Sequence, residues 1–211
     1  MKILFIGAHA DDIEIGCGGI LLKLIKKNKV FNFIATDSEY KNENGKIIRT
    51  VEDAKNDVLR CYKGKKVVNI FGNLKVLNLQ NNEKTRTELL KLKNKITPDV
   101  VFIPWNNDLH PDHKNLSEAS LYVFKDIDNI IMYRSNWYNS PVNLKKNLIL
   151  DISTEFKNKL KLVSSFRSEI KRTKSIWLEK IKQESLLNGQ MINCKYAESF
   201  EAVKISSSFR T

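Results

Sequence analysis

Three stretches near the start of the chain decide the fold: KILFIG at residues 2–7, GGILLKLIKK at 18–27 and VFNFIAT at 30–36. The first and third are short apolar runs, which are typical of strands buried on both faces. The middle stretch places its apolar residues at helical spacing, on one face. Strand, helix and strand in this order form the repeating unit of a parallel sheet covered by helices.

The same alternation continues along the chain. We expect further strands at 67–71, 99–104, 130–133 and 148–152, with a last short strand near 202–205. Helices are expected at 49–62, 85–96 and 111–124 and through the segment 155–182, and residues 40–48 are expected to form an exposed loop. The pattern predicts a single domain over residues 1–211 with an α/β, Rossmann-like three-layer fold and a mainly parallel central sheet. In such sheets ligands bind beyond the carboxyl ends of the strands.

The composition excludes several classes of protein. A chain of 211 residues fits one domain of ordinary size, which needs no disulfide or metal merely to fold. Its three cysteines lie far apart without a CxxC pair, which favours a reducing, cytoplasmic location. No signal peptide fits the N-terminus, and no stretch approaches the ~20 apolar residues of a transmembrane segment.

The net charge of +12 raises the question of a nucleic-acid partner. Residues 155–182 carry nine basic and three acidic side chains, which is half of that excess. Apolar residues recur there at helical intervals, so we interpret the lysines as the solvated faces of amphipathic helices. We therefore expect no specific nucleic-acid binding. A basic nucleic-acid-binding domain with an incidental metal site is the non-enzyme alternative.

All three histidines lie in two short acidic segments, AHADD at residues 8–12 and DLHPDH at 108–113. Each segment follows an expected central strand, and neither contains a lysine or an arginine. Two imidazoles and one carboxylate are the usual protein ligands of a catalytic zinc, and a structural zinc site would call for cysteines. The same ligand types serve non-haem iron oxygenases, the alternative enzyme class. Spacing does not decide between Asp11 and Asp12 as the carboxylate ligand, and helix capping alone would also suit such residues.

The first segment, followed by Glu14, Gly16, Gly18 and Gly19, resembles the N-terminal signature of the LmbE-like (PIG-L) family of zinc-dependent N-acetylglucosamine deacetylases. The second segment resembles the second motif of that family. The similarity extends to Arg49 and Glu52 and to YAESF at residues 196–200, so it touches nearly the whole chain.

The resemblance implies a role for each site residue. His9, Asp12 and His113 would bind one Zn²⁺ per chain, or another divalent ion. Asp11 would be the general base, and His110, oriented by Asp112, would act as an acid or stabilise the oxyanion. Arg49 and Asp108 would lie at the substrate pocket, although Arg49 and Glu52 could instead form a surface pair at the start of a helix. The family usually has proline at the position of Ala10, and it often has Ser-Gln where this chain has Ser168-Glu169.

The expected reaction is hydrolysis of the N-acetyl group of a small GlcNAc-type conjugate, releasing acetate and a free amine. The resemblance suggests a thiol precursor, an antibiotic, a surface glycan or a chitin fragment as the conjugate, and the sequence does not choose among them. It is equally compatible with a monomer and with a homo-oligomer. Trp105 could stack on a sugar or pack in the core, and Cys17 is expected to be a buried thiol.

Overall fold

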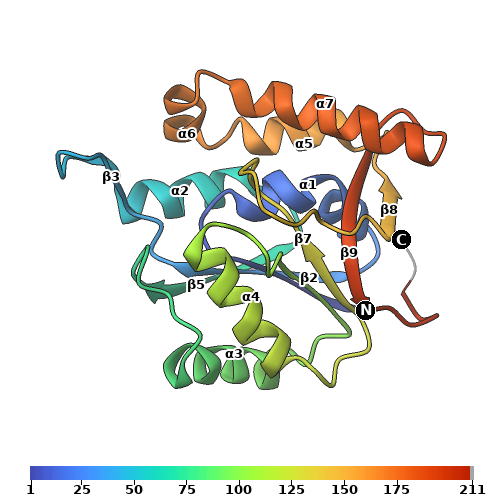
Figure 1. Cartoon of the computed structure of the whole chain (residues 1–211), viewed down its shortest axis with the longest axis horizontal. Helices are drawn as coiled ribbons and strands as arrows, with labels where there is room; N and C mark the ends of the chain where they lie inside the picture. The colour runs from blue at the N-terminus through green and yellow to red at the C-terminus, as the bar shows by residue number, and fades with distance from the viewer. Residues whose placement is uncertain (210–211) are drawn as a thin grey trace.

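The computed structural model describes residues 1–209 and has one central sheet of seven strands in the order β5-β2-β1-β6-β7-β9-β8 (Figure 1). The strands in this order are β5 (Val67–Leu74), β2 (Lys29–Thr36), β1 (Lys2–Gly7), β6 (Val100–Pro104), β7 (Ile130–Tyr133), β9 (Ala197–Lys204) and β8 (Leu148–Asp151). The first five are parallel, whereas β9 runs antiparallel to both of its neighbours. The predicted mainly parallel sheet is confirmed.

Helices cover both faces of the sheet, as expected for a Rossmann-like fold (Figure 1). One face carries α3 (Glu83–Ile96) and α4 (Pro111–Val123), and the other carries α1 (Asp12–Leu24) and α2 (Val51–Cys61). The segments α5 (Phe156–Val163), α6 (Arg167–Arg172) and α7 (Ile176–Met191) lie outside α1, where they share an apolar cluster with Ile15. Trp105 is buried in the cluster beneath α3 and α4, so it is a core residue.

Helix α1 begins at Asp12, six residues before the start expected from the apolar pattern. Its glycines lie inside the helix at points of close approach. A Cβ atom on Gly16 would lie 2.2 Å from Cδ2 of Tyr133, and one on Gly19 would lie 2.6 Å from Cδ1 of Ile152. These glycines therefore allow α1 to pack tightly against β7 and the segment after β8.

The expected loop 40–48 contains a small hairpin instead, formed by β3 (Tyr40–Lys41) and β4 (Ile47–Arg49). Gly45 occupies its turn with φ of +74°, a left-handed conformation that glycine adopts without strain. Helix α2 then begins after Thr50, whose side chain forms a capping box with Asp53. Arg49 is thus the last residue of a strand and not the first of a helix.

Strand β9 is longer than the short strand expected near residues 202–205, and it contains a buried ionic cluster. Glu198 accepts hydrogen bonds from the backbone N–H groups of Gly19 and Ile20, each at 2.8 Å, and its carboxylate lies 2.6 Å from the Lys159 ammonium. Lys159 is 3% exposed. The interpretation of the 155–182 lysines as solvated is therefore wrong for Lys159, which joins α5 to β9.

Two further expectations concern the cysteines and the helices. Cys17, Cys61 and Cys194 are all free, and the first two are buried. Among residues 1–209, the helices lack the combination of length and apolar character that crossing a bilayer requires.

Candidate metal centre

Three neighbouring parallel strands deliver the polar residues of the site. AHADD follows β1, DLHPDH follows β6, and Ser135 and Asn136 follow β7. Because these strands are adjacent and parallel, their carboxyl ends meet at one edge of the sheet, where ligands of such folds bind. The expectation that the two histidine segments come together is met.

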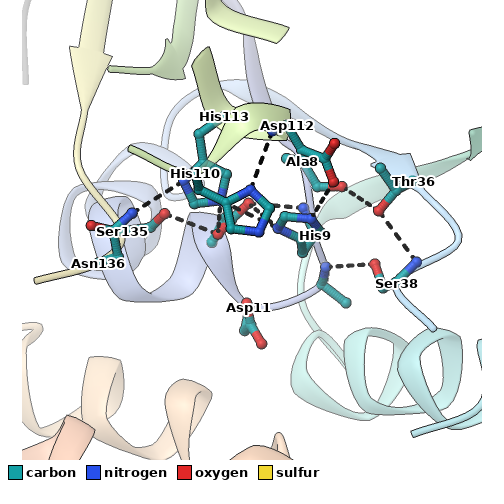
Figure 2. A network of polar contacts seen from close by, with 12 residues as sticks. Ala8, His9, Asp11, Thr36, Ser38, His110, Asp112, His113, Ser135 and Asn136 are labelled. Carbon is teal, nitrogen blue, oxygen red and sulfur yellow. Dashed lines mark hydrogen bonds and ion pairs between the residues drawn. The ribbon is translucent and has the colours of Figure 1, made fainter. Parts of the chain in front are cut away.

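The three predicted ligands, His9, Asp12 and His113, converge. Figure 2 shows the two histidines of this set together with His110. Nδ1 of His9 lies 3.2 Å from Nε2 of His113. One carboxylate oxygen of Asp12 lies 3.1 Å from Nε2 of His113, and the other lies 3.6 Å from Nδ1 of His9. Two ring nitrogens and one carboxylate therefore face a common point.

The other nitrogen of each ring meets a carboxylate. Nε2 of His9 lies 3.0 Å from Asp112, and Nδ1 of His113 lies 2.9 Å from Asp108. A carboxylate in this position accepts the ring N–H and leaves the lone pair on the opposite nitrogen, the arrangement found around metal-bound histidines. The two nitrogens that face each other are thus the ones available to a metal, and the donor set fits zinc.

The electrostatics of the site favour a cation. Burial alone would lower the pKa of His113, but Asp12 and Asp108 raise it to about 10. Burial likewise opposes ionisation of Asp12, yet the adjacent imidazoles hold the pKa of its carboxyl well below the ordinary value. The carboxylates therefore stabilise positive charge at the point where the three ligand atoms meet.

His110 lies beside the same cluster. One ring nitrogen from each of His9, His110 and His113 falls within a 4.8 Å span, so three histidines form an alternative ligand set. Nδ1 of His110 accepts the backbone N–H of Asp112 at 3.2 Å, which assigns the ring proton to Nε2. Burial and the neighbouring histidines lower the pKa of His110 to about 4, so its ring is neutral near pH 7.

Asp112 does not orient His110 through its side chain, contrary to the expectation. Its carboxylate contacts His9 and accepts the backbone N–H groups of Leu77 at 2.8 Å and Leu79 at 3.3 Å. Asp108 also differs from its expected place at the substrate pocket. It supports the His113 ring and accepts the side-chain N–H groups of Asn136 at 2.6 and 2.7 Å. Each carboxylate therefore contacts the ring nitrogen of a histidine that faces away from the other ligands.

Asp11 is drawn below the three rings in Figure 2 and lines the same cavity as they do. Its backbone has φ of +117°, an uncommon conformation for a residue with a side chain, and it immediately precedes α1. Its carboxylate lies 3.1 Å from the guanidinium of Arg49. Burial raises the pKa of Asp11 to about 7, although Arg49 opposes the rise. A carboxyl with such a pKa can exchange a proton near neutral pH.

Arg49 is a buried part of the site. It donates to the carbonyl oxygens of Ser38 at 3.0 Å and Ala10 at 3.3 Å, besides its contact with Asp11. Its guanidinium also lies 3.7 Å from Glu169, a 3% exposed carboxylate on α6. The alternative of a surface pair between Arg49 and Glu52 is therefore wrong.

Ala10, where the family usually has proline, is held by a hydrogen bond. Its backbone N–H donates to Oγ of Ser38 at 2.9 Å, a bond that proline could not make. The hydroxyl of Thr36 donates a hydrogen bond to the carbonyl oxygen of Ala8, in the same loop, at 2.7 Å. The loop that carries His9 is thus fixed from β2 without the proline ring.

The site opens into a cavity of about 260 Å³. Its polar wall includes His9, Asp11, Asp12, Arg49, His110, His113, Ser135, Asn136 and Glu169, and its remaining lining residues are Ile15, Ser38, Glu39, Tyr40, Val76, Tyr138, Arg172 and Trp177. The sequence did not point to Ser135 or Asn136. The Ser135 hydroxyl donates to Asp12 at 2.9 Å, and the Asn136 amide donates to Asp108. Their position directly after β7 was the available signal, because β7 is the next expected parallel strand.

Residues 4–124 match the model of the PIG-L family, described as GlcNAc-PI de-N-acetylase. The chain is also 31% identical over 144 residues to the uncharacterized deacetylase YaiS of Escherichia coli K12, an alignment covering 64% of this chain and 75% of the relative. The family match contains both histidine segments.

Solved structures share the fold. The N,N'-diacetylchitobiose deacetylase of Pyrococcus horikoshii superposes with a TM-score of 0.80 at 22% identity, covering 96% of this chain and 83% of that one. GalB of Pseudomonas putida KT2440, a 4-carboxy-2-hydroxymuconate hydratase, superposes with a TM-score of 0.77 at 12% identity, covering 100% and 99%. At these identities the likeness concerns the fold, so the chemistry must be argued from the site.

Proposed function

Because the chain belongs to the PIG-L family, we propose that it is a zinc-dependent deacetylase that hydrolyses the N-acetyl group of a GlcNAc-type sugar conjugate. The observation that carries the proposal is the convergence of His9, Asp12 and His113, with a carboxylate behind each ring. Family membership does not favour the oxygenase or the nucleic-acid-binding alternative.

In this proposal His9, Asp12 and His113 hold the zinc. Bound there, zinc would lower the pKa of a water molecule towards about 7 and polarise the acetyl carbonyl. Asp11 takes the proton of the attacking water, and its pKa of about 7 suits a base at neutral pH. The water oxygen bonds to the acetyl carbon as Asp11 takes one of the water protons. The C–N bond then breaks as protonated Asp11 returns this proton to the leaving nitrogen. The second water proton passes from the new carboxyl group to the amine, so the products are acetate and an ammonium.

We assign His110 the role of a hydrogen-bond donor to the oxyanion. Its Nδ1 is occupied by the N–H of Asp112, so its Nε2 carries the proton, and the ring lines the cavity. Its lowered pKa makes a neutral donor more suitable than a protonated acid, because few molecules would carry the extra proton at pH 7.

The substrate we propose is a small amino-sugar conjugate, since the cavity is compact and lined by both polar and aromatic residues. Three free thiols are suited to a reducing compartment, and we propose that the protein acts in the cytoplasm.

The test is acetate release from a panel of N-acetylglucosamine conjugates by protein that is freshly purified, stripped with a chelator, or stripped and reloaded with zinc. We expect about one zinc per chain, loss of acetate release on stripping, and recovery on reloading. Zinc added to the stripped His113→Ala variant should restore no acetate release. Unchanged hydrolysis by fully stripped protein, or stoichiometric iron with no acetate release, would contradict the proposal.

A further inference from the structure

Lysines gather at the amino-terminal end of the sheet, where the turn from α1 into β2 lies beside the turn from α2 into β5. The two strands that follow these turns are paired and parallel, with Val30 opposite Val67. The turns line a concave surface of about 510 Å³, and lysines supply half of its lining residues. We name it the lysine surface, and its lysines are Lys26, Lys27, Lys29, Lys65 and Lys66.

The positive charge of this surface is largely uncompensated. No acidic residue lines it. Within residues 1–209, only Lys26 among the five lysines forms an ion pair, with Glu155 at 2.6 Å. Lys27, Lys29 and Lys66 are exposed. Like charges held close together raise the local potential, and a negatively charged partner that covers them is attracted to it.

The sign of the charge changes along the same end of the sheet. Lys2, at the start of β1, lies opposite Lys29 in the strand register. Asp99 and Asp128, by contrast, are exposed just before β6 and β7. The positive charge is therefore confined to the side of β2 and β5, so an anionic partner would meet the protein in one orientation.

Aliphatic side chains lie among the lysines. Ile25, Val67 and Val68 line the same surface, and Val68 is 46% exposed. The lining contains neither an arginine nor an aromatic residue, the side chains that most often read base edges and stack on bases. Lysines with aliphatic neighbours instead match the boundary of an anionic bilayer, where charged headgroups lie above an apolar region. The composition of the surface therefore favours a membrane over a nucleic acid.

We propose that the lysine surface binds the face of a membrane rich in anionic phospholipid. This inference goes beyond the proposed deacetylase function and does not depend on it. The metal centre lies at the carboxyl ends of the parallel strands, whereas the lysine surface lies at their amino ends. A protein bound in this way holds its cavity away from the bilayer and open to molecules in solution. The surface thus determines where the protein is held and gives no access to a substrate within the bilayer.

The test is cosedimentation of the whole chain with phosphatidylcholine vesicles that contain about 30% phosphatidylserine, and with vesicles of phosphatidylcholine alone, in ~0.1 M salt. We expect binding to the anionic vesicles only, and we expect it to weaken as the salt concentration rises. The combined variant Lys27→Gln, Lys29→Gln and Lys66→Gln should bind about a hundredfold more weakly, since each lysine near an anionic surface contributes about fivefold in affinity.

The matched control replaces three exposed lysines of α6 and α7 by glutamine, namely Lys171, Lys180 and Lys182. The change in net charge is the same, and each combined variant alters one lysine that lies over an aromatic ring, Lys29 over Phe31 and Lys180 over Trp137. The control should bind anionic vesicles within about threefold of the unaltered protein, because charges beyond a Debye length are screened. Thermal melts establish that both variants are folded.

Three outcomes would overturn the proposal. The first is equal binding to the two kinds of vesicle, or to neither. The second is an equal loss of affinity in both combined variants, which would show that only the overall charge matters. The third is tighter binding to a short DNA, single-stranded or duplex, at the same salt concentration and with the same loss in the Lys27, Lys29 and Lys66 variant, which would assign the surface to a nucleic acid. Because no arm measures turnover, failure of the deacetylase function would leave these results unchanged.

Discussion

Asp11 and Asp12 are adjacent in the chain, yet their carboxylates have different partners. Asp12 faces His113 and Ser135, whereas Asp11 is paired with Arg49. The structure thus distinguishes two residues that spacing alone left equivalent, because their carboxylates contact different partners at the start of α1.

We expect Asp12→Ala to lose zinc, since one of three protein ligands is removed. Asp11→Asn should keep its zinc and lose kcat/KM by about 10²–10⁴-fold, the usual contribution of a general base. Zinc content and kcat/KM, measured in one buffer, check both outcomes. His110→Ala serves as the third variant. It should keep zinc if His110 is a donor to the oxyanion, and it should lose zinc if the three histidines form the ligand set.

At the scale of elements, α1 depends on its glycines. Gly16→Ala should destabilise the protein by about 2 kcal/mol, because the added methyl group would overlap the fully buried Tyr133 ring, an overpacking cost partly offset by better helix propensity. Gly18→Ala is the control, since a Cβ atom on Gly18 would come no closer than 3.2 Å to its nearest neighbour, Cγ of Lys159. Urea unfolding of both variants measures the difference. Equal free energies of unfolding for the two variants would show that the Tyr133 ring can move to accommodate a methyl group at Gly16 at little cost.

The limits of sequence reasoning also show at this scale. The apolar strands β1, β2, β6 and β7 were predicted because burial on both faces leaves continuous apolar runs. The start of α1 was not predicted, because carboxylates and glycines interrupt its apolar pattern. The first half of β9 was missed for a similar reason, since Glu198 is a charged residue whose partner, Lys159, is distant in sequence. Residues that serve the site or a tertiary contact interrupt the apolar pattern by which helices and strands are predicted. The tertiary contacts that explain them cannot be read from a single sequence.

For the whole molecule, the metal should contribute to stability. The carboxylates at the centre stabilise positive charge, so a cation that binds only the folded chain should raise the melting temperature. At a free zinc concentration of about 100 Kd the gain is ~2.7 kcal/mol, or roughly 5–10 °C for a chain of this size. Thermal melts with zinc and with chelator measure it. His113→Ala should show no such shift, and an equal shift in that variant would place the zinc elsewhere.

The position of β9 in the sheet has a consequence for how the chain is made. Within residues 1–209, strand β8 pairs only with β9, which begins 46 residues after β8 ends. On the ribosome that interval lasts roughly 2–9 s, during which β8 and the outer side of β7 stay unpaired. Unpaired strand edges attract other chains. The nascent protein is therefore most open to aggregation between the synthesis of β8 and that of β9, when the residues of the candidate metal centre have been made but the outer strands of the sheet cannot yet pair.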